Sequence, residues 1–130
     1  EAARYMNRGL DFCLDNFDFE AKSQSQVRCE NMLQPRLDTE NSPTAHRYHL
    51  IGAETTPCFQ VKKSAITGVV QREEKSYFTG VVTSGRCTIK TGESEIRLDT
   101  FDKFFCPAGI EAFTVEAEEE VQILECYPPA

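Results

Sequence analysis

Two histidines, His46 and His49, form a His-x-x-His pattern in the chain. Imidazole is a common transition-metal ligand, and residues three apart share one face of a helix, where a pair could chelate. Here Pro43 precedes the pair, and Tyr48 and Leu50 alternate with polar residues as in a strand. Side chains three apart in a strand point to opposite faces. The spacing therefore favours two loop or surface histidines over a metal pair.

A pair of carboxylates, Glu73 and Glu74, lies between Arg72 and Lys75 in the sequence QREEKS, just before the apolar run YFTGVV. Two buried carboxylates could act as general acid and general base, or could bind a ligand. The alternative is a charged turn that is solvated and has no chemical role. The second interpretation is favoured, and both glutamates are kept as candidate ligand-binding residues.

Three cations, Arg86, Lys90 and Arg97, lie on or near a predicted hairpin whose turn is the sequence TGE. Cations at the mouth of a β-barrel could bind a sugar phosphate. More often such cations are outward-facing partners of nearby carboxylates, here Glu93 and Glu95. We keep the three as candidate ligand-binding residues.

The cysteines are candidate nucleophiles, disulfide partners or buried thiols. None lies in a Cys-x-x-Cys pair, Cys58 and Cys106 have structural surroundings, and Cys87 should point inward with Ile89. An even number could indicate disulfides in a secreted protein, but no signal peptide precedes these residues, so we expect reduced thiols in a cytoplasmic protein. The six are Cys13, Cys29, Cys58, Cys87, Cys106 and Cys126.

The elements that position these residues change in character along the chain. The first 17 residues carry apolar residues at helical spacing, which predicts one N-terminal helix. Residues 18–45 are polar with two prolines and no lasting period, which predicts an extended connector. We expect residues 1–45 to form this helix and connector. The apolar positions of the helix are Ala3, Met6, Leu10, Cys13, Leu14 and Phe17.

From Tyr48 to Tyr127 the chain alternates apolar and polar residues in short runs separated by turn sequences such as TSG, TGE and PAG. Short alternating strands at this spacing predict an all-β sandwich or barrel. We therefore expect residues 46–130 to form one antiparallel β-barrel domain.

The composition limits the partners. The chain has 130 residues, which suits one domain, and a formal net charge of −7, which disfavours nucleic acid and anionic membrane surfaces. No stretch approaches the roughly 20 apolar residues of a membrane span. A small phosphorylated ligand needs only a local positive site and remains compatible. Because the chain begins at Glu1 within a predicted helix, we expect a fragment of a longer protein.

The segment from Tyr77 to Pro129 resembles half of a cupin barrel. The strand and turn at residues 82–89 match the family's first glycine-containing pattern. Asp102 and the Pro-Ala-Gly turn at residues 107–109 match its second motif, Gly-Asp-x-x-x-x-Pro-Ala-Gly-x-x-His. Phe101 and Ala112 stand where that motif has glycine and histidine. The resemblance implies a jelly-roll fold, and the two departures imply that this barrel holds no metal.

The arrangement as a whole resembles the C-terminal part of a class I mannose-6-phosphate isomerase-like protein, in which a helix-containing connector leads to a second cupin barrel. The stretch TPCFQVKKSAI and the Pro-Ala-Gly turn carry this resemblance. It implies that zinc and the catalytic residues belong to a missing N-terminal domain, so we assign no catalytic residue and no cofactor to this chain.

Two functions stay open from the sequence. The first is an accessory cupin domain that is inactive alone and packs on a catalytic domain or pairs with another chain. The second is a stand-alone, metal-free cupin that binds a small carbohydrate or metabolite, or serves only for assembly. The complete reading frame would distinguish them, because an upstream barrel with histidine and glutamate ligands supports the first.

Overall fold

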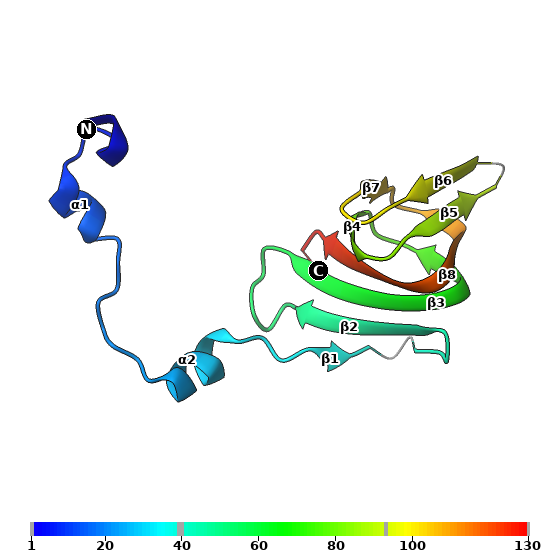
Figure 1. Ribbon diagram of the computed structural model, residues 1–130, viewed down its shortest axis with the longest axis horizontal. Coiled ribbons are helices and arrows are strands. Elements are labelled where there is room, and N and C mark those ends of the chain that lie inside the picture. The colour runs from blue at the N-terminus through cyan, green and yellow to red at the C-terminus, as the bar shows by residue number, and fades with distance from the viewer. Residues whose placement is uncertain (1, 39–40, 93, 130) are drawn as a thin grey trace. The chain divides into compact units, whose positions relative to one another are not determined.

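The computed structural model describes residues 2–38, 41–92 and 94–129, and the chain divides into two compact units, residues 1–32 and 33–130 (Figure 1). The sequence placed a boundary near residue 45, whereas β1 (Arg36–Leu37) already pairs with the next strand. Among the described helices, none is long and apolar enough to cross a membrane.

The N-terminal unit contains short helices in place of the single helix expected. A 3-10 helix spans Ala2–Tyr5, and α1 spans Leu10–Leu14. Between them Met6, Asn7 and Gly9 have φ values of 50°, 60° and 81°. A right-handed helix cannot continue through left-handed backbone, so the apolar spacing is interrupted there.

A further helix, α2 (Gln24–Asn31), lies within the stretch expected to be extended. It begins with a capping box at Ser23 and Gln26. The Ser23 hydroxyl accepts a hydrogen bond from the Gln26 backbone N–H, and the Gln26 side chain accepts one from the Ser23 N–H. No residue of α2 is buried. Its cap, rather than an apolar period, marks its position in the sequence.

The second unit is an antiparallel β-sheet, which confirms the all-β prediction. Its strand order is β1-β2-β3-β8-β4-β7, with β5 pairing β6 and β8. The sheet curls into an open jelly roll without closing (Figure 1). The remaining strands are β2 (Ala45–Ile51), β3 (Gln60–Glu74), β4 (Phe78–Ser84), β5 (Cys87–Thr91), β6 (Ser94–Leu98), β7 (Lys103–Cys106) and β8 (Ile110–Tyr127).

Two strands are much longer than the short runs expected: β3 has 15 residues and β8 has 18. They pair along almost their whole length, and a register shift at Gly68 (φ 81°) bends the ladder. This pair forms the curved centre of the sheet (Figure 1). Every other described strand except β1, β6 and β7 pairs with one of these two.

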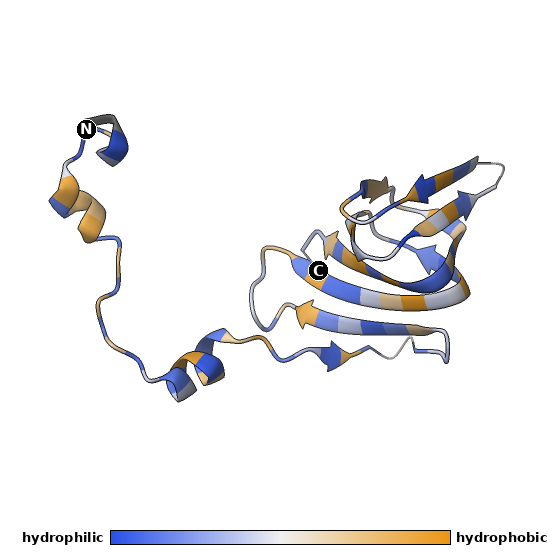
Figure 2. Ribbon diagram, in the orientation of Figure 1, coloured by the Kyte–Doolittle hydropathy of each residue, from blue (hydrophilic) through white to orange (hydrophobic). Residues whose placement is uncertain are grey.

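Alternation along the strands builds the core (Figure 2). The inward residues Phe78, Val82, Val115 and Val121 are fully buried, each with no exposed surface. Cys87 and Ile89 both point into this core, as predicted. All six cysteines are unpaired in the structure, and Cys87 and Cys106 are buried.

Candidate functional site

Four charged side chains converge inside the curl of the sheet. Arg47 comes from β2, Arg72 and Glu74 from β3, and Glu125 from β8. Arg47 is 6% exposed, Glu74 is 9% exposed and Glu125 is 0% exposed. Charged side chains are rarely this buried unless they are paired, so the contacts among these four must compensate for their lost hydration.

The four form a closed ion-pair network. An Nη2 of Arg47 lies 2.9 Å from Glu74 Oε1 and 2.8 Å from Glu125 Oε2. Arg72 donates from Nη1 to Glu125 Oε1 at 2.5 Å and from Nη2 to Glu74 Oε1 at 2.8 Å. Two guanidinium groups thus share two carboxylates, and their formal charges sum to zero.

Two neutral side chains complete the network. The Ser64 hydroxyl donates to Glu125 Oε1 at 2.6 Å. The Tyr127 hydroxyl lies 3.0 Å from an oxygen of Glu74 and of Glu125, and it accepts a hydrogen bond from Arg47. Buried polar groups stabilise a fold only when their hydrogen bonds are satisfied, and here each carboxylate has several donors.

Strand parity and register bring these residues together. On β8, Glu125 has the same inward parity as Ile123 and Tyr127. On β2, Arg47 faces Ser64 of β3 directly across the ladder. Arg72 has the same parity along β3 as Ser64 and Ile66, and it lies opposite the buried Phe113 of β8, so it points inward as well. The network therefore joins β2, β3 and β8 inside the sheet.

The network sets the protonation of its members. Burial by itself would raise the pKa of Glu125, but the positive charge and hydrogen bonds of Arg72, with Arg47, hold it at about 2. Burial would lower the pKa of Arg72, yet Glu125 keeps it above its ordinary value. Burial raises the pKa of the Tyr127 phenol, and the negative charge of Glu125 raises it further. At neutral pH the carboxylate is charged and the phenol is neutral.

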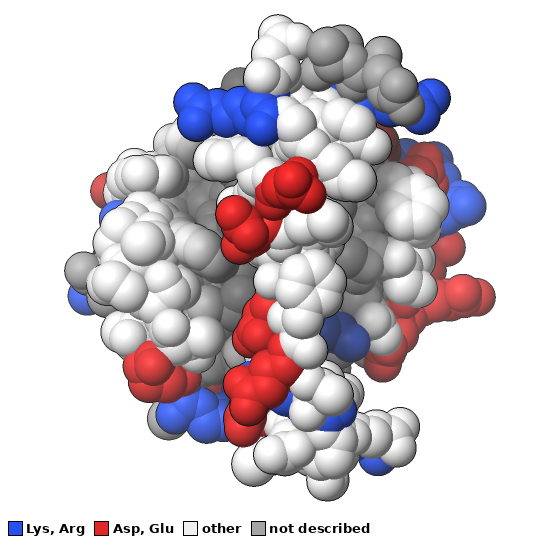
Figure 3. All heavy atoms as spheres, turned by 90° about the vertical axis from the view of Figure 1, so that its left-hand side faces the viewer, with Lys and Arg blue, Asp and Glu red and all other residues white. Residues whose placement is uncertain are grey.

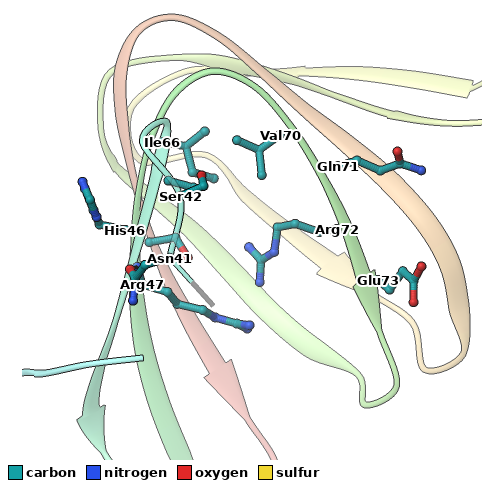
Figure 4. Close-up of a pocket in the computed structure, with 11 residues that line it drawn as sticks. Asn41, Ser42, His46, Arg47, Ile66, Val70, Gln71, Arg72 and Glu73 are labelled. Atoms are coloured by element: carbon teal, nitrogen blue, oxygen red, sulfur yellow. Dashed lines mark hydrogen bonds between the residues drawn. The ribbon is translucent and has the colours of Figure 1, made fainter. Parts of the chain in front are cut away.

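A pocket of about 540 Å³ opens beside the network (Figure 4). Arg47 and Arg72 point into it, whereas His46, Gln71 and Glu73 point away from its centre. Ile66 and Val70 form an apolar part of its wall, and Ser64, Asn41, Ser42 and Ala45 also line it.

The interior donor set does not suit a transition metal. Guanidinium groups offer no lone pair, and both carboxylates are already engaged by arginine. Ala112, at the position of the cupin motif's histidine, has no donor atom. No group of three His, Cys, Asp or Glu residues that could hold a metal occurs in the described part of the chain.

The structure separates the two predicted glutamates. Glu73 is exposed, whereas Glu74 is buried in the network. The interpretation of a solvated charged turn is therefore wrong for Glu74, because it lies at the inward-facing end of β3 rather than in a turn. Whether either residue binds a ligand stays a prediction.

The three predicted cations lie away from this pocket, on the exposed surface of the β5–β6 hairpin. Arg86 is 3.5 Å from Asp99, and Lys90 is 2.7 Å from Glu116. The hydrogen bond that Lys90 donates to Glu116 raises the pKa of Lys90. Arg86 and Arg97 line one small recess together.

Of the predicted partners of these cations, Glu95 faces Lys90 across the hairpin, and Glu93 lies outside the described residues. The charge of Glu95 raises the pKa of Lys90, but the ion pair that Lys90 makes is with Glu116, which was not among the predicted partners. A phosphate-binding role of the three cations stays a prediction.

The two histidines occupy β2, as the alternation indicated. His46 is exposed and points away from the pocket, whereas His49 Nε2 lies 3.1 Å from Asp38 Oδ2. They do not converge. Sequence reasoning missed Arg47, Glu125 and Tyr127 as site residues. Parity was the available signal, since Glu125 alternates in phase with the apolar residues of VQILEC.

No protein-family model and no curated protein sequence matches the chain. Solved structures do. The EutQ protein of Clostridium difficile superposes with a TM-score of 0.62 at 16% identity, covering 73% of this chain and 70% of that one.

Two further structures show the same likeness. KdgF from Halomonas sp. has a TM-score of 0.56 at 18% identity, over 80% of this chain and 93% of that one. The cupin domain of Cnp3 from Schizosaccharomyces pombe has a TM-score of 0.54 at 11% identity, over 71% and 66%. The chain therefore has a cupin fold, as the resemblance implied; at these identities the likeness concerns the fold alone.

Proposed function

We propose that this chain is a non-catalytic, accessory cupin domain of a mannose-6-phosphate isomerase-like protein. The observation that carries the proposal is the ion-pair network of Arg47, Arg72, Glu74 and Glu125, which places mutually neutralised charges inside the curl of the sheet. Free thiols at all six cysteines suit a reducing compartment, so the proposal includes a cytoplasmic location.

Aldose–ketose isomerisation explains why this interior suits an accessory role. The reaction needs a base that moves a proton between adjacent carbons and a cation that polarises the substrate oxygens. With its pKa held at about 2, Glu125 is a weak base at neutral pH. The guanidinium charges of Arg47 and Arg72 are directed at carboxylates. The zinc and the base are expected in an upstream domain.

The test is a coupled mannose 6-phosphate assay of the purified chain with added zinc, together with elemental analysis after dialysis. The expected result is no turnover and no stoichiometric metal. One metal per chain inside the barrel, or turnover that survives repurification, would overturn the proposal. In the complete protein, Arg72→Met should lower thermal stability and leave kcat/KM of the catalytic domain unchanged; a large loss of kcat/KM without unfolding would contradict an accessory role.

The pocket favours a second candidate, a metal-free cupin that binds a small carbohydrate or metabolite. Its volume of about 540 Å³ suits a small ligand, and Arg47, Arg72 and Ser64 offer polar groups beside apolar Ile66. Calorimetric titration with mannose and mannose 6-phosphate tests it. Binding that Arg47→Met abolishes and that the outward-pointing control Gln71→Ala retains would support this candidate.

A further inference from the structure

The outer face of the large sheet carries a continuous row of side chains across five strands. Register places Tyr48 of β2 opposite Lys63 of β3, and Lys63 opposite Leu124 of β8. Leu124 then faces Val81 of β4, which faces Lys103 of β7. All five positions alternate with inward residues, so the row lies on the side of the sheet opposite the ion-pair network.

A second row runs beside the first. Val61, Cys126, Thr79 and Phe105 are cross-strand neighbours from β3 to β7. The Phe105 ring is 63% exposed and contacts the ring of Tyr77, with centroids 6.1 Å apart. Val61 is 9% exposed but does not belong to the core cluster, which agrees with its outward direction. We call these two rows the outer face.

The charge of the outer face differs from that of the chain. The chain has a net charge of −7. The outward positions of this face belong to β2, β4, β7, the first part of β3 and the last part of β8, and all of them are described. They include Lys63 and Lys103 but no carboxylate. An apolar surface with only positive charges suits an apolar partner with negative charges.

Residues 10–20 have that chemistry, and we call them the acidic segment. They include Asp11, Asp15, Asp18 and Glu20 and no lysine or arginine. Phe17 and Phe19 of this segment are 65% and 73% exposed. Figure 3 shows acidic groups, drawn in red, interspersed with uncharged side chains on the face turned to the viewer. The further apolar members are Leu10, Phe12 and Leu14.

We propose that the acidic segment of one copy of this chain binds the outer face of a second copy, and so forms a homodimer by reciprocal exchange. The dimensions agree. Lys63 and Lys103 are three strand spacings apart, roughly 14 Å. Asp15 and Glu20 are five residues apart, which spans at most about 17 Å when extended.

The apolar contacts carry most of the expected affinity. Exposed ion pairs contribute little and are screened by salt, whereas aromatic side chains that enter an apolar surface contribute strongly. Phe17 and Phe19 should therefore matter more than any one carboxylate. The lysines fix the register of the segment on the sheet. The inference does not depend on the proposed accessory role, because dimerisation and turnover are measured separately.

Sedimentation of the full chain over a range of concentrations tests the proposal. The expected result is a monomer–dimer equilibrium that Phe17→Asp with Phe19→Asp weakens at least about tenfold. Lys63→Glu with Lys103→Glu should weaken it by a smaller factor, and adding Asp15→Lys with Glu20→Lys should restore part of the loss. Met6→Asp and Ile96→Asp remove exposed apolar residues elsewhere and should have no effect.

A peptide of residues 9–21, with Cys13→Ser, separates the possible occupants. It should bind the Phe17→Asp/Phe19→Asp chain, and Lys63→Glu with Lys103→Glu should weaken that binding. A chain that stays monomeric at all concentrations would overturn the proposal. This includes a monomer whose acidic segment covers its own outer face, which hydrogen exchange would detect as protected amides in β4 and β7. A dimer that is insensitive to Phe17 and Phe19 would also overturn it.

Discussion

Replacing Arg72 by methionine tests how the barrel interior is held together. Arg72 makes contacts of 2.5 and 3.2 Å to Glu125 and one of 2.8 Å to Glu74. Its removal leaves Glu125, a fully buried carboxylate, with a single guanidinium and the hydroxyls of Ser64 and Tyr127. Removing one partner of a buried ion pair costs about 3–5 kcal/mol, a large part of the ~5–15 kcal/mol typical of a domain.

Urea unfolding at pH 7 measures this loss. Arg72→Met should lower the free energy of unfolding by about 3–5 kcal/mol. Adding Glu125→Gln should return part of it, because the uncompensated charge is then gone, and the double variant should be more stable than the sum of the single effects by about 1 kcal/mol or more. Gln71→Met, an exposed neighbour on the other face of β3, should change stability by less than about 0.5 kcal/mol.

Two results would refute this reasoning. If Arg72→Met is as stable as the original chain, the network contributes nothing to the fold. If the double variant loses the full sum of the single effects, Arg72 and Glu125 do not interact energetically and the destabilisation of Arg72→Met comes from lost packing of the arginine stem alone.

Three further predictions follow from burial and backbone geometry. Since the pKa of Glu125 is lowered from 4.5 to about 2, its stabilisation of roughly 3 kcal/mol is complete above pH 4.5 and is lost as the pH falls toward 2; acid unfolding of Glu125→Gln should lack this dependence. Burial raises the pKa of Cys87 to about 11, so a thiol reagent at pH 8 should label exposed Cys58 at once and Cys87 only on unfolding. Gly85→Ala places a Cβ 2.5 Å from a β8 carbonyl oxygen and should lower the melting temperature more than Gly92→Ala, which has open space; equal effects would contradict the crowding argument.

The all-β fold was predictable because alternation is a local signal. Phe113 and Val115, or Ile96 and Leu98, show period-two spacing within a few residues, and the Pro-Ala-Gly turn marks a strand boundary. The length of β3 and β8 was not predictable in the same way. The exposed run Glu118, Glu119 and Glu120 interrupts the apolar alternation of β8 where the ladder shifts register, so one bent strand reads as two short ones.

The site was less predictable, because its members are distant in sequence. Arg47 and Glu125 meet only through the register of β2, β3 and β8. The QREEKS sequence has the composition of a solvated turn, yet Glu74 is buried since two arginines from different strands neutralise the carboxylates there. Ion pairs between residues that are distant in the chain cannot be recognised from the local sequence pattern.

The ladder between β3 and β8 also governs how the chain matures on the ribosome. The end of β8 pairs with the start of β3, since Tyr127 lies opposite Gln60. While translation proceeds, β2 and β3 can pair, but one edge of β3 stays open until the last strand of the sheet emerges. A chain that stops before Glu125 would lack the carboxylate that Arg72 contacts. Its sheet would enclose an interior with excess positive charge, which makes it a substrate for quality control rather than a functional domain.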